Sequence, residues 1–118
     1  MEYKILNDMM KLTRWALPVI GKFPRNYRYS LGLKIENQLY LLIDRINSSI
    51  AKTYIASELN AISNDLNSLR LYVRLAEEMK LFQGQQHYAF IQQIDELGRQ
   101  VGGMIKAVEK TKDNKPKV

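Results

Sequence analysis

The chain has 118 residues, of which 46% are hydrophobic and 25% charged, enough for one domain with a sizeable core and too few to require a second. It contains no cysteine, which excludes disulfides, thiolate zinc sites and cysteine nucleophiles. Eighteen Lys and Arg residues against twelve Asp and Glu residues give a formal net charge of +6. This balance favours polyanionic partners such as nucleic acid.

The first ten residues, MEYKILNDMM, mix charged and amide side chains with apolar ones. They therefore lack the continuous apolar core of a signal peptide or a membrane-spanning helix. We expect a cytoplasmic protein with no membrane partner.

Apolar residues at alternating steps of four and three predict a first helix over residues 3–22. Its seam contains Ile5, Met9, Leu12, Ala16, Val19 and Phe23. Pro18 should kink or shorten this helix, because proline removes a backbone hydrogen bond and clashes with the preceding turn. Trp15 lies off the seam and either packs within the subunit or anchors a subunit contact. Pro24 then breaks the chain.

The segment between Asp8 and Glu36 has no acidic residue and six basic ones: Lys11, Arg14, Lys22, Arg25, Arg28 and Lys34. We interpret it as a local positive field, in which Lys22, Arg25 and Arg28 are candidate contacts to nucleic acid. The alternative is scattered surface charge.

Two tyrosines, Tyr27 and Tyr29, alternate with Arg25 and Arg28. Aromatic rings beside guanidinium groups can stack single-stranded bases. The alternative is that these tyrosines pack at the entry to the next helix.

A second helix should begin between Asn26 and Ser30, either of which can cap it. Its seam contains Ile35, Leu39, Leu42, Ile46 and Ile50. The additional apolar residues Tyr40, Leu41 and Ile43 widen this stripe beyond what one partner helix covers. They indicate a second contact side, for which a subunit interface is one candidate.

The third helix should start near Ser57 as its cap and end at Gly84 as a left-handed C-cap. Its seam contains Leu59, Ile62, Leu66, Leu69, Val73, Ala76 and Met79. After Gly84 the rhythm resumes and predicts a fourth helix antiparallel to the third. The seam of that helix contains Ile91, Ile94, Gly98, Val101, Ile105 and Val108.

These elements predict an all-α fold, an antiparallel up-down-up-down four-helix bundle over residues 1–110. Residues 111–118, TKDNKPKV, are polar and basic, contain Pro116 and show no apolar periodicity. We expect them to form a basic disordered tail.

No set of side chains predicts catalysis. His87 is the only histidine and has no serine or cysteine partner at useful spacing, and the acidic pairs at 77–78 and 95–96 diverge around a helix. The glycines of the fourth helix follow no strand and precede no GK[ST], so close helix packing explains them better than a phosphate loop. These are Gly98, Gly102 and Gly103. We predict a protein that is not an enzyme and has no metal or cofactor.

The segments FPRNYRYSLGLKI, LRLYVRLAEEMKL and ELGRQVGGMIK together resemble the Avd family, the accessory variability determinant proteins of diversity-generating retroelements. They are also similar to the wider group of small four-helix-bundle proteins encoded in intervening sequences of bacterial 23S ribosomal RNA genes. The similarity runs from the middle of the first predicted helix through the fourth.

The resemblance implies a homopentameric barrel of four-helix bundles that binds the retroelement reverse transcriptase and its RNA or DNA, without an active site of its own. It also implies functional roles for Arg70 and Arg74, the two arginines that match the family motif. The alternative for this pair is a solvated helix face, with Arg74 bound to Glu77 or Glu78. The alternative function is a self-assembling bundle encoded in a ribosomal RNA intervening sequence, without a polymerase partner.

Overall fold

The computed structural model describes residues 4–51 and 55–113, which form five α-helices. Their bounds are α1 Lys4–Gly21, α2 Arg25–Arg28, α3 Leu31–Ala51, α4 Ala56–Glu78 and α5 Gln86–Asp113. The connection between the second and third predicted helices falls largely on residues 52–54, which lie outside the described residues. The predicted tail began at residue 111, but residues 111–113 belong to α5. Residues 114–118 lie outside the described residues, and for them the tail stays a prediction.

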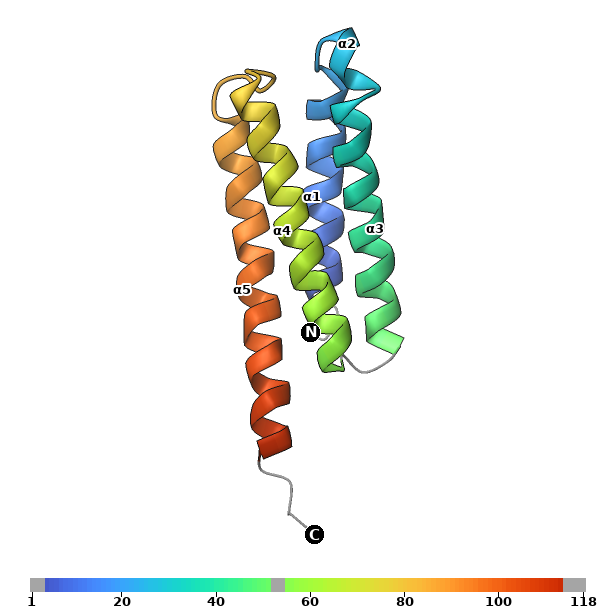
Figure 1. Ribbon diagram of the computed structural model, residues 1–118, viewed down its shortest axis with the longest axis vertical. Coiled ribbons are helices and arrows are strands. Elements are labelled where there is room, and N and C mark those ends of the chain that lie inside the picture. Colours follow the sequence, from blue (N-terminus) through green and yellow to red (C-terminus); the bar gives the residue numbers. More distant parts are fainter. Residues whose placement is uncertain (1–3, 52–54, 114–118) are drawn as a thin grey trace.

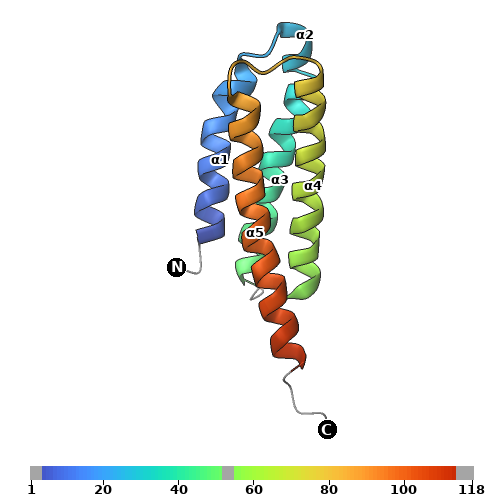
Figure 2. The ribbon, with the colours of Figure 1, turned by 90° about the vertical axis from the view of Figure 1, so that its left-hand side faces the viewer.

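The four long helices stand side by side and alternate in direction (Figure 1). The chain follows α1 toward α2, returns along α3, follows α4 back to the α2 end and descends along α5. Helices α1 and α4 each contact both α3 and α5, which closes a ring of four helices around one core. The predicted four-helix bundle is therefore confirmed. Seen from the side, α5 extends beyond the other helices at the end far from α2 (Figure 2).

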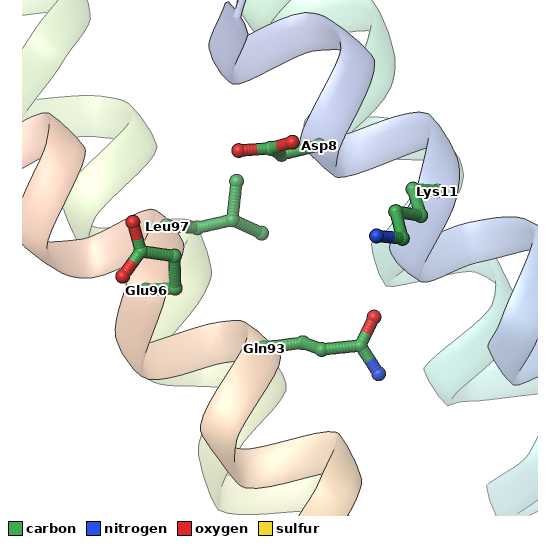
Figure 3. Close-up of a pocket in the computed structure, with 5 residues that line it drawn as sticks. All are labelled: Asp8, Lys11, Gln93, Glu96 and Leu97. Atoms are coloured by element: carbon green, nitrogen blue, oxygen red, sulfur yellow. The ribbon is translucent and has the colours of Figure 1, made fainter.

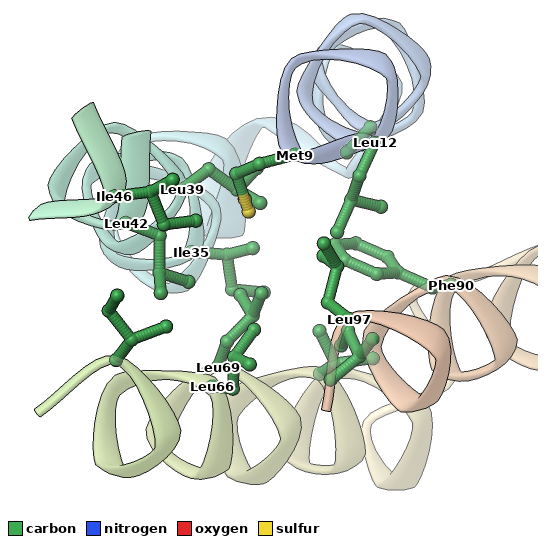
Figure 4. Close-up of a cluster of buried hydrophobic side chains, with 14 of the residues drawn as sticks. Met9, Leu12, Ile35, Leu39, Leu42, Ile46, Leu66, Leu69, Phe90 and Leu97 are labelled. Atoms are coloured by element: carbon green, nitrogen blue, oxygen red, sulfur yellow. The ribbon is translucent and has the colours of Figure 1, made fainter. Parts of the chain in front are cut away.

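The core lies along the axis of the bundle, where side chains from all four long helices meet (Figure 4). The predicted seams of α1, α3 and α4 are buried over most of their length, because the 3.6-residue period keeps these positions on one face. In α5 the buried positions are Phe90, Ile94, Leu97 and Val101. The predicted seam missed Phe90 and Leu97 and included Gly98, so the inward face of α5 is rotated by about one residue from the prediction.

The two prolines near the junction of α1 and α3 have different outcomes. Helix α1 continues through Pro18 to Gly21 and is not shortened at the proline. Pro18 is exposed, so the carbonyl that loses its intrahelical partner lies on the solvent side. Pro24 does break the helix, but it also starts the unpredicted single turn α2, in which the N–H of Tyr27 donates to the Pro24 carbonyl oxygen at 2.8 Å.

Gly32, near the start of α3, allows α2 to approach α3 closely. A Cβ at Gly32 would lie 3.0 Å from the Tyr27 carbonyl oxygen and 3.1 Å from the Ile20 side chain. Ser30 precedes α3, within the predicted range, and its hydroxyl donates to the Asn26 carbonyl oxygen at 3.1 Å. This hydrogen bond links the residue before α3 back to α2.

Both predicted ends of the third long helix were wrong. Helix α4 begins at Ala56 with Ile55 in the cap position, so Ser57 lies inside its first turn. At the other end α4 stops at Glu78, well before Gly84. Gly84 does adopt a positive φ of 53°, but it lies in the loop that leads to α5.

The residue that ends α4 is Lys80, whose φ is 60°. Its N–H donates to the Glu77 carbonyl oxygen at 2.9 Å, and the N–H of Leu81 donates to the Ala76 carbonyl oxygen at 3.0 Å. These two bonds define a Schellman motif with a lysine in the left-handed position where glycine is usual. The prediction required a glycine in the left-handed position, so it placed the helix end at Gly84 and missed the end at Lys80.

Candidate nucleic-acid and partner interface

The end of the bundle that carries α2 presents basic side chains to solvent. Lys22 follows α1, and Arg25 opens α2, and both side chains are exposed. In the described part of the chain, neither has a carboxylate within ion-pair distance. Their charge is therefore available to an external anion.

A cluster of aromatic rings holds this end together. Phe23, 1% exposed, meets Phe82 edge-on with ring centroids 5.4 Å apart. Phe82 meets Phe90 at 6.0 Å, and Phe90 meets Trp15 at 5.5 Å in the same manner. Such edge-to-face pairs favour one relative orientation. They fix the α1–α2 connection against the loop before α5, and they show that Trp15 packs within the subunit.

The side chain of Arg28 is held at the same cluster by a hydrogen bond to the backbone of Phe23. Its Nη2 donates to the Phe23 carbonyl oxygen at 3.3 Å, and its Nε is buried without a hydrogen-bond partner in the described structure. Arg28 is half-buried, unlike Lys22 and Arg25. It adds positive charge to this end from a fixed position.

The two tyrosines of this segment have different environments. Tyr27 is partly buried and packs against the hydrophobic core. Tyr29 has 70% of its surface exposed. Of the predicted base-stacking pair, only Tyr29 is therefore available to a ligand, beside Arg28 in sequence.

Arg70 connects α4 to α5. Its Nη1 donates to Asn67 Oδ1 at 2.7 Å, and its Nη2 donates to Asp95 Oδ1 at 2.9 Å. A Cβ at Gly98 would lie 3.7 Å from Arg70 Nη2, an ordinary contact distance, so Gly98 faces the guanidinium but is not required to make room for it. Arg70 thus has two acceptors within the subunit.

Arg74 lies one turn farther along α4 and is much more exposed. Its Nε donates to Glu78 Oε2 at 3.1 Å, and the two side chains are 71% and 58% exposed. The predicted alternative pairing with Glu78 is therefore present. An exposed pair of this kind contributes little stability, so Arg74 can exchange Glu78 for another anion at small cost.

The remaining glycines of the predicted set are not closely packed against the described residues. A Cβ added at Gly102 or Gly103 would meet no atom of the described residues within 4 Å. The close-packing interpretation is wrong for these two positions.

A pocket of about 220 Å³ lies between α1 and α5 (Figure 3), lined by Asp8, Lys11, Gln93, Glu96 and Leu97. Hydrogen bonds from Lys4 at 2.8 Å and Gln100 at 2.7 Å lower the pKa of Asp8. Arg99, whose Nη2 lies 2.7 Å from Glu96 Oε2, lowers the pKa of Glu96. Both carboxylates are held ionised, which does not suit either of them to act as a general acid.

His87 does not line the pocket that contains Asp8 and Glu96. Its Nδ1 lies 3.1 Å from Glu77 Oε2 at the α2 end of the bundle, and its ring lies 6.0 Å from that of Phe82. Over the described ranges, no group of three or more His, Cys, Asp and Glu side chains is arranged to hold a metal ion.

The bAvd-like family model matches residues 3–108. The chain belongs to the bAvd-like family. This match covers α1 through α4 and most of α5, and it includes every basic residue described above. Comparison with curated proteins and comparison with solved structures give no match. Within the described residues of this bAvd-like protein, no helix combines the length and the apolar character needed to cross a membrane.

The structure adds one residue to the basic end of this bAvd-like protein. Lys80 is exposed and lies in the loop after α4, at the same end as α2 (Figure 1). Sequence reasoning placed it inside a helix that continued to Gly84. Whether the helix ends before Lys80 or continues to Gly84 depends on which residue adopts the left-handed conformation. Glycine usually adopts it, so nothing in the sequence near Lys80 indicates that a lysine does so here.

Proposed function

We propose that the protein is a non-enzymatic accessory protein of a diversity-generating retroelement. It acts as a basic homo-oligomer, a pentamer, that binds the reverse transcriptase together with RNA or DNA and supports mutagenic cDNA synthesis. Membership of the bAvd-like family over residues 3–108 is the observation that carries this proposal.

The distribution of charge supports a contact with nucleic acid. The chain carries a formal net charge of +6, and five copies in a ring would bring five basic bundle ends close together. Lys22, Arg25 and Lys80 have no carboxylate partner in the described structure, and Arg74 has only an exposed one. Cations in this state gain most from contact with phosphates, because they have no internal partner to give up.

The proposed contact is to the backbone of the nucleic acid. The described residues form a bundle with antiparallel helices and contain no stranded sheet that could present aromatic residues to bases. Binding should therefore depend strongly on salt and weakly on base sequence. Tyr29 adds one exposed ring for stacking.

The five predicted contact residues divide into two groups. We propose that Lys22, Arg25 and Arg74 contact the polyanion or the polymerase directly. Arg28 and Arg70 contribute from within the fold, because the Phe23 carbonyl in one case and Asn67 and Asp95 in the other already hold their guanidinium groups.

The test compares two charge-reducing pairs of substitutions. Lys22→Gln with Arg25→Gln removes two cations from the α2 end, and Lys106→Gln with Lys110→Gln removes two exposed cations from the far part of α5. Binding of a single-stranded RNA oligonucleotide is measured by fluorescence anisotropy at several salt concentrations. If both side chains contact phosphates, the first pair should reduce the salt slope by about 1.4, with a clear loss of affinity, and the control pair should change it little.

Equal losses in the two variants would contradict the assignment of the α2 end, because they would indicate attraction by net charge alone. Co-purification with a reverse transcriptase of a diversity-generating retroelement, with and without nuclease treatment, then tests the polymerase contact. Failure to co-purify under both conditions would overturn the accessory role.

A further inference from the structure

Exposed apolar side chains are distributed unevenly around the bundle. Large exposed hydrophobic residues concentrate on α3 and α4, whereas α1 contributes only Met10 and the described part of α5 only Tyr88. The two flanks that include α5 carry polar contacts instead, such as Asp8 with Gln100 on one side and Arg70 with Asp95 on the other. The bundle therefore has a polar half around α5 and an apolar half around α3.

One apolar patch, the α3–α4 patch, consists of Leu41, Leu71, Leu75 and Met79, which are 41%, 58%, 42% and 38% exposed. Leu71 and Leu75 of α4 and Met79 at its C-cap follow one another at steps of four and so form a continuous stripe. Leu41 lies on the flank of α3 from which Gln38 and Arg45 reach Asp65 of α4. A shallow hollow of about 290 Å³ adjoins the stripe, lined by Leu71, Tyr72, Arg74, Leu75 and Glu78.

A second patch, the α1–α3 patch, centres on Met10 and Tyr40, each 41% exposed. Asp8 and Trp15 mark the flank of α1 that contacts α5, and Met10 lies on the opposite flank, toward α3. Tyr40 lies on the side of α3 away from Gln38 and Arg45. The partly buried Ile43 continues this patch inward.

The rims of the two patches differ in charge. Lys34 and Arg74 lie beside the α3–α4 patch, and Lys34 sits over the ring of Tyr72 at 5.3 Å. Glu36 and Asp44 lie one turn before and one turn after Tyr40, and Glu36 accepts a hydrogen bond from the Tyr40 hydroxyl at 2.8 Å. Glu78 also lines the hollow of the α3–α4 patch, and the exposed Arg14 lies one turn after Met10 in the α1–α3 patch. The first rim is therefore basic only on balance and the second acidic only on balance, and these net charges are complementary between two copies of the same chain.

We propose that the α3–α4 patch of one copy packs against the α1–α3 patch of the next copy, an inference that rests on the homo-oligomer of the proposed function. The contact is heterologous, because its two sides are different surfaces. The patches lie on neighbouring flanks, on either side of α3, so successive copies are rotated about the ring axis and the chain of contacts can close. A stable contact buries about 800 Å² per partner, which is about a tenth of the 7653 Å² that this chain exposes.

Substitutions that introduce a charge into each patch test this arrangement. Leu75→Glu disables the α3–α4 patch, Tyr40→Glu disables the α1–α3 patch, and Tyr88→Glu on α5 is a matched control with an exposed side chain. Circular dichroism checks that each variant is folded. Light scattering after gel filtration should show that the wild-type protein and Tyr88→Glu assemble and that each patch variant alone is monomeric.

The decisive sample is an equimolar mixture of the two patch variants. Each variant retains the surface that the other has lost, so a heterologous contact predicts heterodimers and nothing larger. Monomers in the mixture, or patch variants that assemble like the wild type, would overturn the assignment. Variants that remain assembled but lose the reverse transcriptase would assign the patch to the polymerase instead. A monomeric wild-type protein would overturn the homo-oligomer of the proposed function itself, a result distinct from failure of the patches alone.

Discussion

The α2 end and the α4–α5 flank both carry arginines, but the two regions use them differently. On the flank, Arg70 has Asn67 and Asp95 as acceptors. At the α2 end, Lys22 and Arg25 have no carboxylate partner in the described structure, and the rigidity there comes from aromatic rings. Positive charge strengthens the fold in the first region and is available to a ligand in the second.

The difference also separates two residues that the sequence treats as a pair. Arg70 and Arg74 lie on adjacent turns of α4, yet Arg70 crosses to α5 while Arg74 pairs only with Glu78 of its own helix. Spacing places both on the same side of α4, but the neighbouring helix reaches only one of them. The substitutions below test whether basic residues held by partners inside the subunit differ in role from those that are free to bind a ligand.

The largest effect is expected at the aromatic cluster. Phe23→Ala should lower the free energy of unfolding by about 3 kcal/mol, because it removes a fully buried ring from the junction of α1 and α2. It should also weaken binding of a single-stranded RNA, although no charge is lost, because the cluster positions Arg25 and Arg28. Urea unfolding and fluorescence anisotropy measure the two quantities.

Phe23→Leu is the matched control, since it keeps an apolar side chain there and should cost about 1 kcal/mol. If Phe23→Ala destabilises the protein but leaves the RNA affinity unchanged, the cluster does not position the basic end.

Sequence periodicity was sufficient for the fold because a bundle core is set by the 3.6-residue repeat alone. The seams around Leu39, Leu66 and Ile94 are buried as predicted. The prediction was wrong where the conformation or orientation of a single residue determines where a helix ends or which face it buries. Glycine was expected to end α4, but Lys80 takes the left-handed conformation, and α5 turned its aromatic Phe90 inward in preference to Gly98.

The candidate site could be predicted only in part, for a different reason. The net charge and the basic segment up to Lys34 are properties of the sequence. Whether a particular arginine is available depends on an acceptor far away in the chain, such as Asp95 for Arg70. The apolar surfaces around Met10 and Leu75 likewise depend on which flank of each helix the other helices leave uncovered.

An intermediate effect is expected on the flank. Arg70→Ala should lower the free energy of unfolding by about 1 kcal/mol, because it removes two charge-assisted hydrogen bonds from a partly exposed site. Arg74→Ala should change it by less than about 0.5 kcal/mol, since the pair with Glu78 is exposed. Chemical denaturation of both variants measures the difference.

The RNA affinity should show the reverse order, with the greater loss in Arg74→Ala. A double-mutant cycle that adds Asp95→Ala isolates the contribution of the Arg70–Asp95 pair. Equal destabilisation by the two arginine substitutions would remove the distinction between them.

The smallest expected effect is at Lys80, where conformation and charge can be separated. A non-glycine residue in the left-handed region costs about 1 kcal/mol, partly because its Cβ approaches the following carbonyl. Lys80→Gly relieves this strain but loses more backbone entropy on folding, so we expect a net stabilisation of about 0.5 kcal/mol.

Lys80→Ala removes the same charge and keeps the Cβ, so it should not be stabilising. Both variants should weaken RNA binding to a similar, small extent, because each removes one exposed cation from the α2 end. A gain in stability for glycine alone, with equal losses of affinity, would show that this lysine is retained for its charge at a cost to the helix end. Equal stabilities of the two variants would instead mean that the Schellman turn does not strain the lysine, and unchanged affinity would remove Lys80 from the basic surface.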